Sequence, residues 1–86
     1  MYIHLGQDTV VRSGELLGIF DLDRTTVSRA TRDFLAEATA RGEVVNVTAE
    51  LPKSFVVTAT RGGTRRVFIS QLGPATLSRR ARAMDK

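Results

Sequence analysis

Arginine is the residue type whose spacing suggests chemistry in this 86-residue chain. One cluster, from Arg61 to Arg66, includes two glycines, and glycine amides with guanidinium groups can bind phosphate. The cluster lies between two expected strands, so it matches no nucleotide-binding fingerprint. A second cluster, from Arg79 to Arg82, places cations on an expected helix. Both clusters are consistent either with nucleic-acid contact or with a solvated surface. The candidate nucleic-acid-binding residues are Lys53, Arg61, Arg65, Arg66, Arg79, Arg80 and Arg82.

The other residues of chemical interest favour structural roles. His4 has no partner at the spacing of a metal site or of a catalytic base, which favours a strand histidine. Asp21 and Asp23 precede an expected helix, and one of them as a helix cap is favoured over acid–base work. The chain contains no cysteine. We therefore expect no catalytic residue, metal site, cofactor or small-molecule substrate, and do not expect an enzyme.

Charge is divided unevenly along the chain. Residues 1–52 contain five basic and eight acidic residues, for a net charge of −3, whereas residues 53–86 contain eight basic residues and one acid, for +7. The total of +4 favours polyanionic partners such as duplex DNA. Halves of opposite charge also favour head-to-tail contacts between copies, and a small core with open strand edges would gain from such contacts. We expect a homo-oligomer, with a closed ring as one form of it.

Hydrophobic patterning predicts an α+β fold with the order β-β-β-α-β-β-β-α, a small and mostly antiparallel sheet, and one long helix packed on it. Residues 2–12 form a hairpin, and residues 16–20 are an apolar run typical of a central buried strand in which Gly18 indicates a bulge or a close approach. Strands are also expected over 44–48, 54–60 and 65–70, and the last two form a hairpin whose two glycines allow positive φ. Gly73 and Pro74 begin a short final helix with Leu77, Ala81 and Met84 on one face.

The long helix is predicted over residues 27–41. Apolar side chains recur there with helical spacing, so Phe34 and Leu35 are expected to be buried against the sheet. Asp23, Thr25 or Thr26 can cap its start, and Gly42 is the expected stop.

The length fits a single domain over residues 1–86, and no segment approaches the roughly 20 apolar residues of a membrane span. The first residues lack the features of a signal peptide, so we expect a cytoplasmic protein without membrane contact.

The motifs together resemble a known family. They are Met1–Gly6, Gly18–Asp21, Phe34–Leu35, Pro52–Thr58, and Ser70 followed by Thr76–Ala81. Each is weak alone, but they cover almost the whole chain in order. The chain resembles the bacterial extracellular matrix regulatory proteins (RemA/RemB), specifically the RemB-like branch.

The resemblance implies a small regulator of biofilm matrix genes, related to proteins that bind DNA and assemble into rings. RemA-like members carry adjacent arginines before the strand that begins near Ser54, and another in the third strand. Here those positions are Glu50–Leu51 and Glu15, and only Lys53 keeps a basic character. Two hypotheses follow: an oligomeric DNA-binding transcription regulator, or a protein-interaction and assembly module of the same fold without DNA binding.

Overall fold

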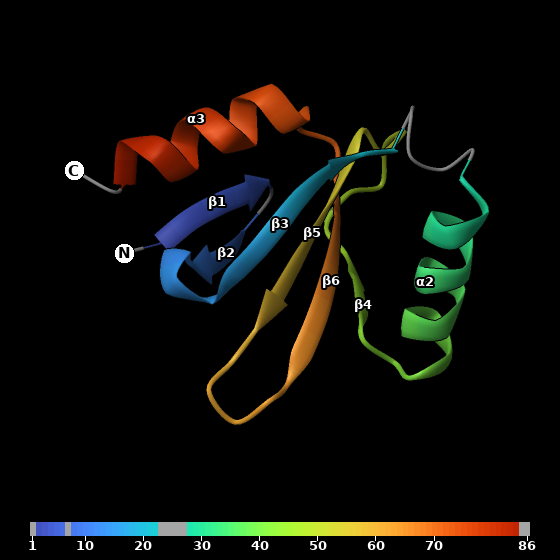
Figure 1. The fold of residues 1–86 in the computed structure, drawn as a ribbon. Coiled ribbons are helices and arrows are strands. Elements are labelled where there is room, and N and C mark those ends of the chain that lie inside the picture. The colour runs from blue at the N-terminus through green and yellow to red at the C-terminus, as the bar shows by residue number, and fades with distance from the viewer. Residues whose placement is uncertain (1, 7, 23–27, 85–86) are drawn as a thin grey trace.

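The computed structural model describes residues 2–6, 8–22 and 28–84 (Figure 1). Its strands and α-helices follow one another along the chain in the order that the hydrophobic pattern predicts. A short 3-10 helix adds to the predicted order. The elements are β1 (Tyr2–Gly6), β2 (Thr9–Arg12), the 3-10 helix (Ser13–Glu15), β3 (Leu16–Asp21), α2 (Arg29–Ala40), β4 (Val44–Asn46), β5 (Ser54–Ala59), β6 (Arg65–Ser70) and α3 (Pro74–Met84).

The described strands form two sheets instead of the single sheet expected. β1 and β2 pair as an antiparallel hairpin, while the other strands form a mixed sheet in the order β3-β5-β6-β4. β5 runs antiparallel to both of its neighbours, β3 and β6, whereas β4 pairs with β6 in parallel. The α+β class is therefore confirmed, and the sheet is less uniformly antiparallel than predicted.

Helices cover both faces of the four-stranded sheet, which corrects the expectation of one long helix. α2 has 12 residues and α3 has 11. α2 lies beside β4 on one face, whereas α3 packs against β1 and β3 on the other (Figure 1). The core is accordingly divided into two clusters. The cluster under α3 contains Ile3, Leu5, Val11, Val47, Val56 and Leu77, and the cluster under α2 contains Ala38, Phe55, Val57 and Val67.

β3 corrects the prediction of a central buried strand over residues 16–20. It lies at an edge of the sheet, and β5 and β6 are the central strands. The predicted irregularity at Gly18 is confirmed, because the pairing register shifts between Leu16 and Gly18. A β-carbon at position 18 would lie 2.7 Å from Cε2 of Phe20, so the missing side chain makes room for that ring. The ring stacks on Phe55 with 4.9 Å between centroids.

The limits of α2 are set by local chemistry. Ser28 is the N-cap, and its hydroxyl accepts a hydrogen bond from the backbone N–H of Thr31. The predicted caps Asp23, Thr25 and Thr26 lie outside the described residues. The predicted stop is confirmed, since Gly42 follows the C-cap residue with a φ of 70°. Phe34 is half-buried against the core, as is its neighbour Leu35, and not fully buried as predicted.

Two buried serines attach the β1–β2 hairpin and α3 to the large sheet. The Ser70 hydroxyl donates a hydrogen bond to the Leu5 carbonyl at 2.6 Å and accepts one from the Leu72 N–H at 3.0 Å. The Ser54 hydroxyl donates to the Leu72 carbonyl at 2.8 Å. Because these polar groups are excluded from water, each bond replaces hydration that folding removes.

Candidate nucleic-acid interface

The β5–β6 hairpin carries three of the candidate cations at its tip. The turn is closed by a hydrogen bond from the Thr60 N–H to the Thr64 carbonyl and by one from the Thr64 N–H to the Thr60 hydroxyl. Gly63 has a φ of 85°, so one of the two glycines uses the predicted left-handed conformation. The side chains at 61–66 are all exposed. The hairpin therefore presents Arg61, Arg65 and Arg66 to solvent.

Arg65 differs from its neighbours because it has a structural partner. Its Nε lies 3.8 Å from Oε1 of Glu43, a carboxylate oxygen that is buried and accepts no hydrogen bond. The guanidinium is the counter-charge nearest to that oxygen. Removal of Arg65 would thus leave a partly buried charge unpaired as well as remove a surface cation. Arg61 and Arg66 have no such ion pair among the described residues.

α3 presents its cations at two different places. Leu77 is buried and faces the core, whereas Arg79 and Arg80 are exposed. Nη1 of Arg80 donates to the carbonyl of His4 at 3.1 Å and so links α3 to β1. Arg82 instead lines a shallow hollow with residues 16–19 of β3.

The seven candidates do not form one continuous patch in a single chain. Lys53 lies before β5, and its backbone N–H donates to the carbonyl of Ser70. The hairpin tip is beyond the other end of β5, and at 3.3 to 3.4 Å per residue the distance from Lys53 to Ala59 is about 20 Å. α3 and the hairpin tip also lie at opposite ends of the view in Figure 1. The cations therefore form separate groups at the hairpin tip, on α3 and at Lys53.

The fold adds Arg12 to the hairpin group, which sequence reasoning missed. Arg12 ends β2 and lines a hollow of about 880 Å³ with Arg61 from the hairpin and Glu15 from the 3-10 helix. The ring of Tyr2 is half-exposed at the same hollow. Arg12 belongs to the acidic part of the chain in sequence, so charge counting along the chain gave no signal for it.

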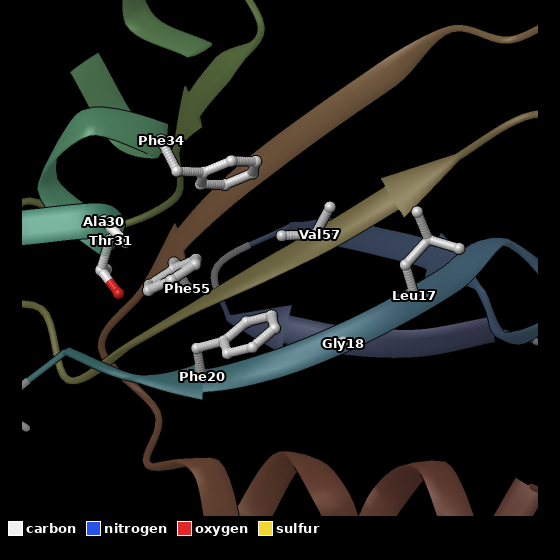
Figure 2. Close-up of a pocket in the computed structure, with 8 residues that line it drawn as sticks. All are labelled: Leu17, Gly18, Phe20, Ala30, Thr31, Phe34, Phe55 and Val57. Atoms are coloured by element: carbon white, nitrogen blue, oxygen red, sulfur yellow. The ribbon is translucent and has the colours of Figure 1, made fainter. Parts of the chain in front are cut away.

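A second unpredicted feature is an apolar groove between β3 and α2. Its volume is about 300 Å³, and it is lined by Leu17, Gly18, Phe20, Ala30, Thr31, Phe34, Phe55 and Val57 (Figure 2). Figure 2 shows the rings of Phe20, Phe34 and Phe55 gathered at one end of it. The groove exists because α2 covers the β4 side of the sheet and leaves the β3 side of that face open.

Comparison with known proteins identifies the family. The model of the RemA-like family, described as extracellular matrix regulatory protein A-like, matches residues 2–81. This chain belongs to the RemA-like family. Extracellular matrix regulatory protein B of Bacillus subtilis (strain 168) is 37% identical over 84 residues, which cover 98% of this chain and 94% of that protein. The family is one of regulatory proteins, and its description names no enzymatic activity.

Two of the three positions that the resemblance associates with arginines in RemA-like members are on the surface. Glu50 and Leu51 lie on the loop between β4 and β5, and both are exposed, Leu51 to 83%. The hydroxyl of Thr48 holds this loop by accepting a hydrogen bond from the Glu50 N–H at 2.9 Å. The loop thus presents an acid and an apolar side chain, and neither attracts phosphate.

Two features are absent from the described part of the chain. Over residues 2–6, 8–22 and 28–84 the acidic residues and His4 form no cluster suited to a metal ion. In that same part of the chain, no helix has the length and apolarity needed to cross a membrane.

Proposed function

We propose that this protein is a homo-oligomeric DNA-binding regulator of genes for bacterial extracellular matrix or biofilm formation. Its membership of a regulatory family supports the regulatory role. The observation that carries DNA binding is the excess of exposed cations after residue 52. All seven candidate side chains are exposed, and of these seven only Arg65 forms an ion pair with another described residue. Such unpaired cations gain from binding phosphates because counterions are released from the DNA.

Contact is mainly with the DNA backbone. The guanidinium groups lie on a hairpin tip and on the outer side of a short helix. Cations distributed over separate positions suit phosphates, which repeat along both strands, better than they suit the edges of particular bases. Binding should therefore depend weakly on DNA sequence and strongly on salt.

Several copies are needed for useful affinity. One copy offers four cations at the hairpin, three on α3 and Lys53 alone, and these groups are separated on its surface. Linking several weak sites in one assembly raises the overall affinity without any new contact. An oligomer would repeat the hairpin group, which comprises Arg12, Arg61, Arg65 and Arg66, at regular intervals along a duplex.

The test is electrophoretic retardation of duplex DNA at several salt concentrations. The double variant Arg61→Ala/Arg66→Ala removes two exposed cations and keeps the Arg65–Glu43 pair. If each cation neutralises one phosphate, the slope of log affinity against log salt should decrease in magnitude by about 1.8 per copy in contact with DNA. Arg79→Ala tests α3 in the same way and leaves the Arg80–His4 bond in place.

The matched control is Arg29→Ala/Arg32→Ala. It makes the same change in net charge on the exposed side of α2, which carries no proposed contact. Its slope should equal that of the unchanged protein. If the slope decreases by the same amount in both double variants, only the net charge matters and the hairpin is not the contact. If the unchanged protein does not retard DNA at low salt, DNA binding is rejected.

A second function is favoured by Glu15, Glu50 and Leu51, which replace the arginines of RemA-like members. In that case the chain is an assembly or protein-interaction module of the same fold without DNA contact. It would keep its solution mass and fail to bind DNA under every salt condition.

A further inference from the structure

β3 is an open edge of the four-stranded sheet. It pairs with β5 on one side, and no strand among the described residues pairs with its other side. Open edges present backbone N–H and C=O groups to other chains, and soluble proteins usually block them with charges, prolines, β-bulges or very short strands. Over residues 16–20, β3 has only the bulge at Gly18. β3 has six residues, and residues 16–20 include neither a charge nor a proline. The opposite edge, β4, is protected by its length of three residues.

The side chains on this edge are unusually exposed for apolar groups. Leu17 is 65% exposed and Phe20 is 41% exposed, and both line the groove shown in Figure 2. The bulge at Gly18 brings these two side chains to the same face of the sheet. Leu16 and Ile19 pack against the core on the other face. A strand added to this edge would remove Leu17 and Phe20 from water, which is favourable.

The charges near the two ends of β3 are opposite in sign. Asp21 ends the strand, and Arg82 lies beside its first part, in the hollow lined by residues 16–19. When two copies of one strand pair antiparallel about a two-fold axis, the end of each strand lies beside the start of the other. An axis near Gly18 and Ile19 would therefore bring the carboxylate of Asp21 in each copy close to Arg82 of the other.

We infer that β3 is a self-association edge at which two copies of this chain pair antiparallel. The two four-stranded sheets become one continuous sheet, and Leu17 and Phe20 are covered. A second copy is favoured over an unrelated peptide because the exchange of Asp21 and Arg82 makes the edge complementary to itself. The β3 edge is therefore one contact surface of the proposed homo-oligomer. Only the cellular purpose of this contact rests on the proposed function. The pair uses both β3 edges, so a larger assembly has a second contact elsewhere.

The first test is the solution mass of Leu17→Lys, measured by light scattering at tens of micromolar protein. Leu17 is exposed, so lysine is tolerated by the fold but places a charge in the contact. The control is Leu51→Lys, the same substitution at an exposed position between β4 and β5. We expect Leu17→Lys to halve the mass, or to raise the dissociation constant by about tenfold or more. Leu51→Lys should match the unchanged protein.

The second test reverses the charges. Arg82→Asp alone should weaken association, and the double variant Asp21→Arg/Arg82→Asp should restore it, because both ion pairs re-form with opposite orientation. Circular dichroism of each variant confirms folding. A Leu17→Lys variant with unchanged mass, a monomeric unchanged protein, or a double variant no better than Arg82→Asp would each overturn the inference. If the unchanged protein associates as expected but does not bind DNA, the proposed function is rejected and the β3 contact still stands.

Discussion

Replacing Ser70 with alanine tests the buried hydrogen bonds that attach β1 and the start of α3 to the sheet. Ser70 is 0% exposed, and its hydroxyl serves the Leu5 carbonyl and the Leu72 N–H at the same time. Alanine fits the same space but makes neither bond. Since water has no access at Ser70, these two backbone groups would lose their partner without replacement.

The expected cost follows from the number of groups left unpaired. A buried polar group without a partner costs about 1 to 3 kcal/mol, and Leu72 is only half-buried, so we expect a loss of about 2 to 4 kcal/mol. A domain of 86 residues has a total stability of about 4 to 13 kcal/mol. The thermal midpoint should therefore decrease by about 10 to 25 °C.

The assay is thermal unfolding followed by far-ultraviolet circular dichroism. Ser54→Ala, which breaks one bond to Leu72, should give a smaller decrease than Ser70→Ala. Ser13→Ala makes the same chemical change in the 3-10 helix and should alter stability by no more than about 0.5 kcal/mol. A decrease below about 3 °C for Ser70→Ala would refute the reasoning, because it would show that the two backbone groups find other partners.

Four other substitutions are tested by the same measurement. Phe34→Ala should cost about 1 to 2 kcal/mol, less than the 3 to 5 kcal/mol of a fully buried phenylalanine, because the ring is half-buried in the groove wall; a loss above that range would mean that the groove is closed in solution. Gly18→Ala should displace the ring of Phe20 and lower stability by about 1 kcal/mol, and an unchanged midpoint would mean that the ring moves freely. Gly63→Ala should cost about 1 to 2 kcal/mol because φ is positive there. Gly62→Ala, where a β-carbon meets only the Thr60 hydroxyl at 3.8 Å, should be nearly neutral, and equal losses at both positions would contradict the turn geometry.

The sequence predicted the elements that depend on neighbouring residues. The stripe of apolar side chains located α2, and Gly42 and Pro74 marked a helix end and a helix start, because these signals act within one or two turns. The N-cap was missed at Ser28, since several other capping residues lie just before it. Local patterns of this kind require no knowledge of the fold.

Features that depend on the arrangement of strands could not be predicted in the same way. The apolar run at 16–20 has the composition of a central strand, and an edge strand covered by another copy would have the same composition. Arg12 and Arg61 are far apart in sequence and share one hollow only because the β1–β2 hairpin lies beside the end of β5. Conversely, the clusters at Arg61–Arg66 and Arg79–Arg82 are close in sequence and separate in space.

The most direct test of phosphate binding by an assembly is a salt titration of the unchanged protein with two duplexes of unrelated sequence. Log affinity should decrease linearly with log salt for both duplexes, with a slope of about −0.9 for every phosphate neutralised and similar values for the two sequences. The mass of the complex should show more than one copy on each duplex. Binding that is absent at low salt, insensitive to salt, or made by a single copy would contradict the proposed function.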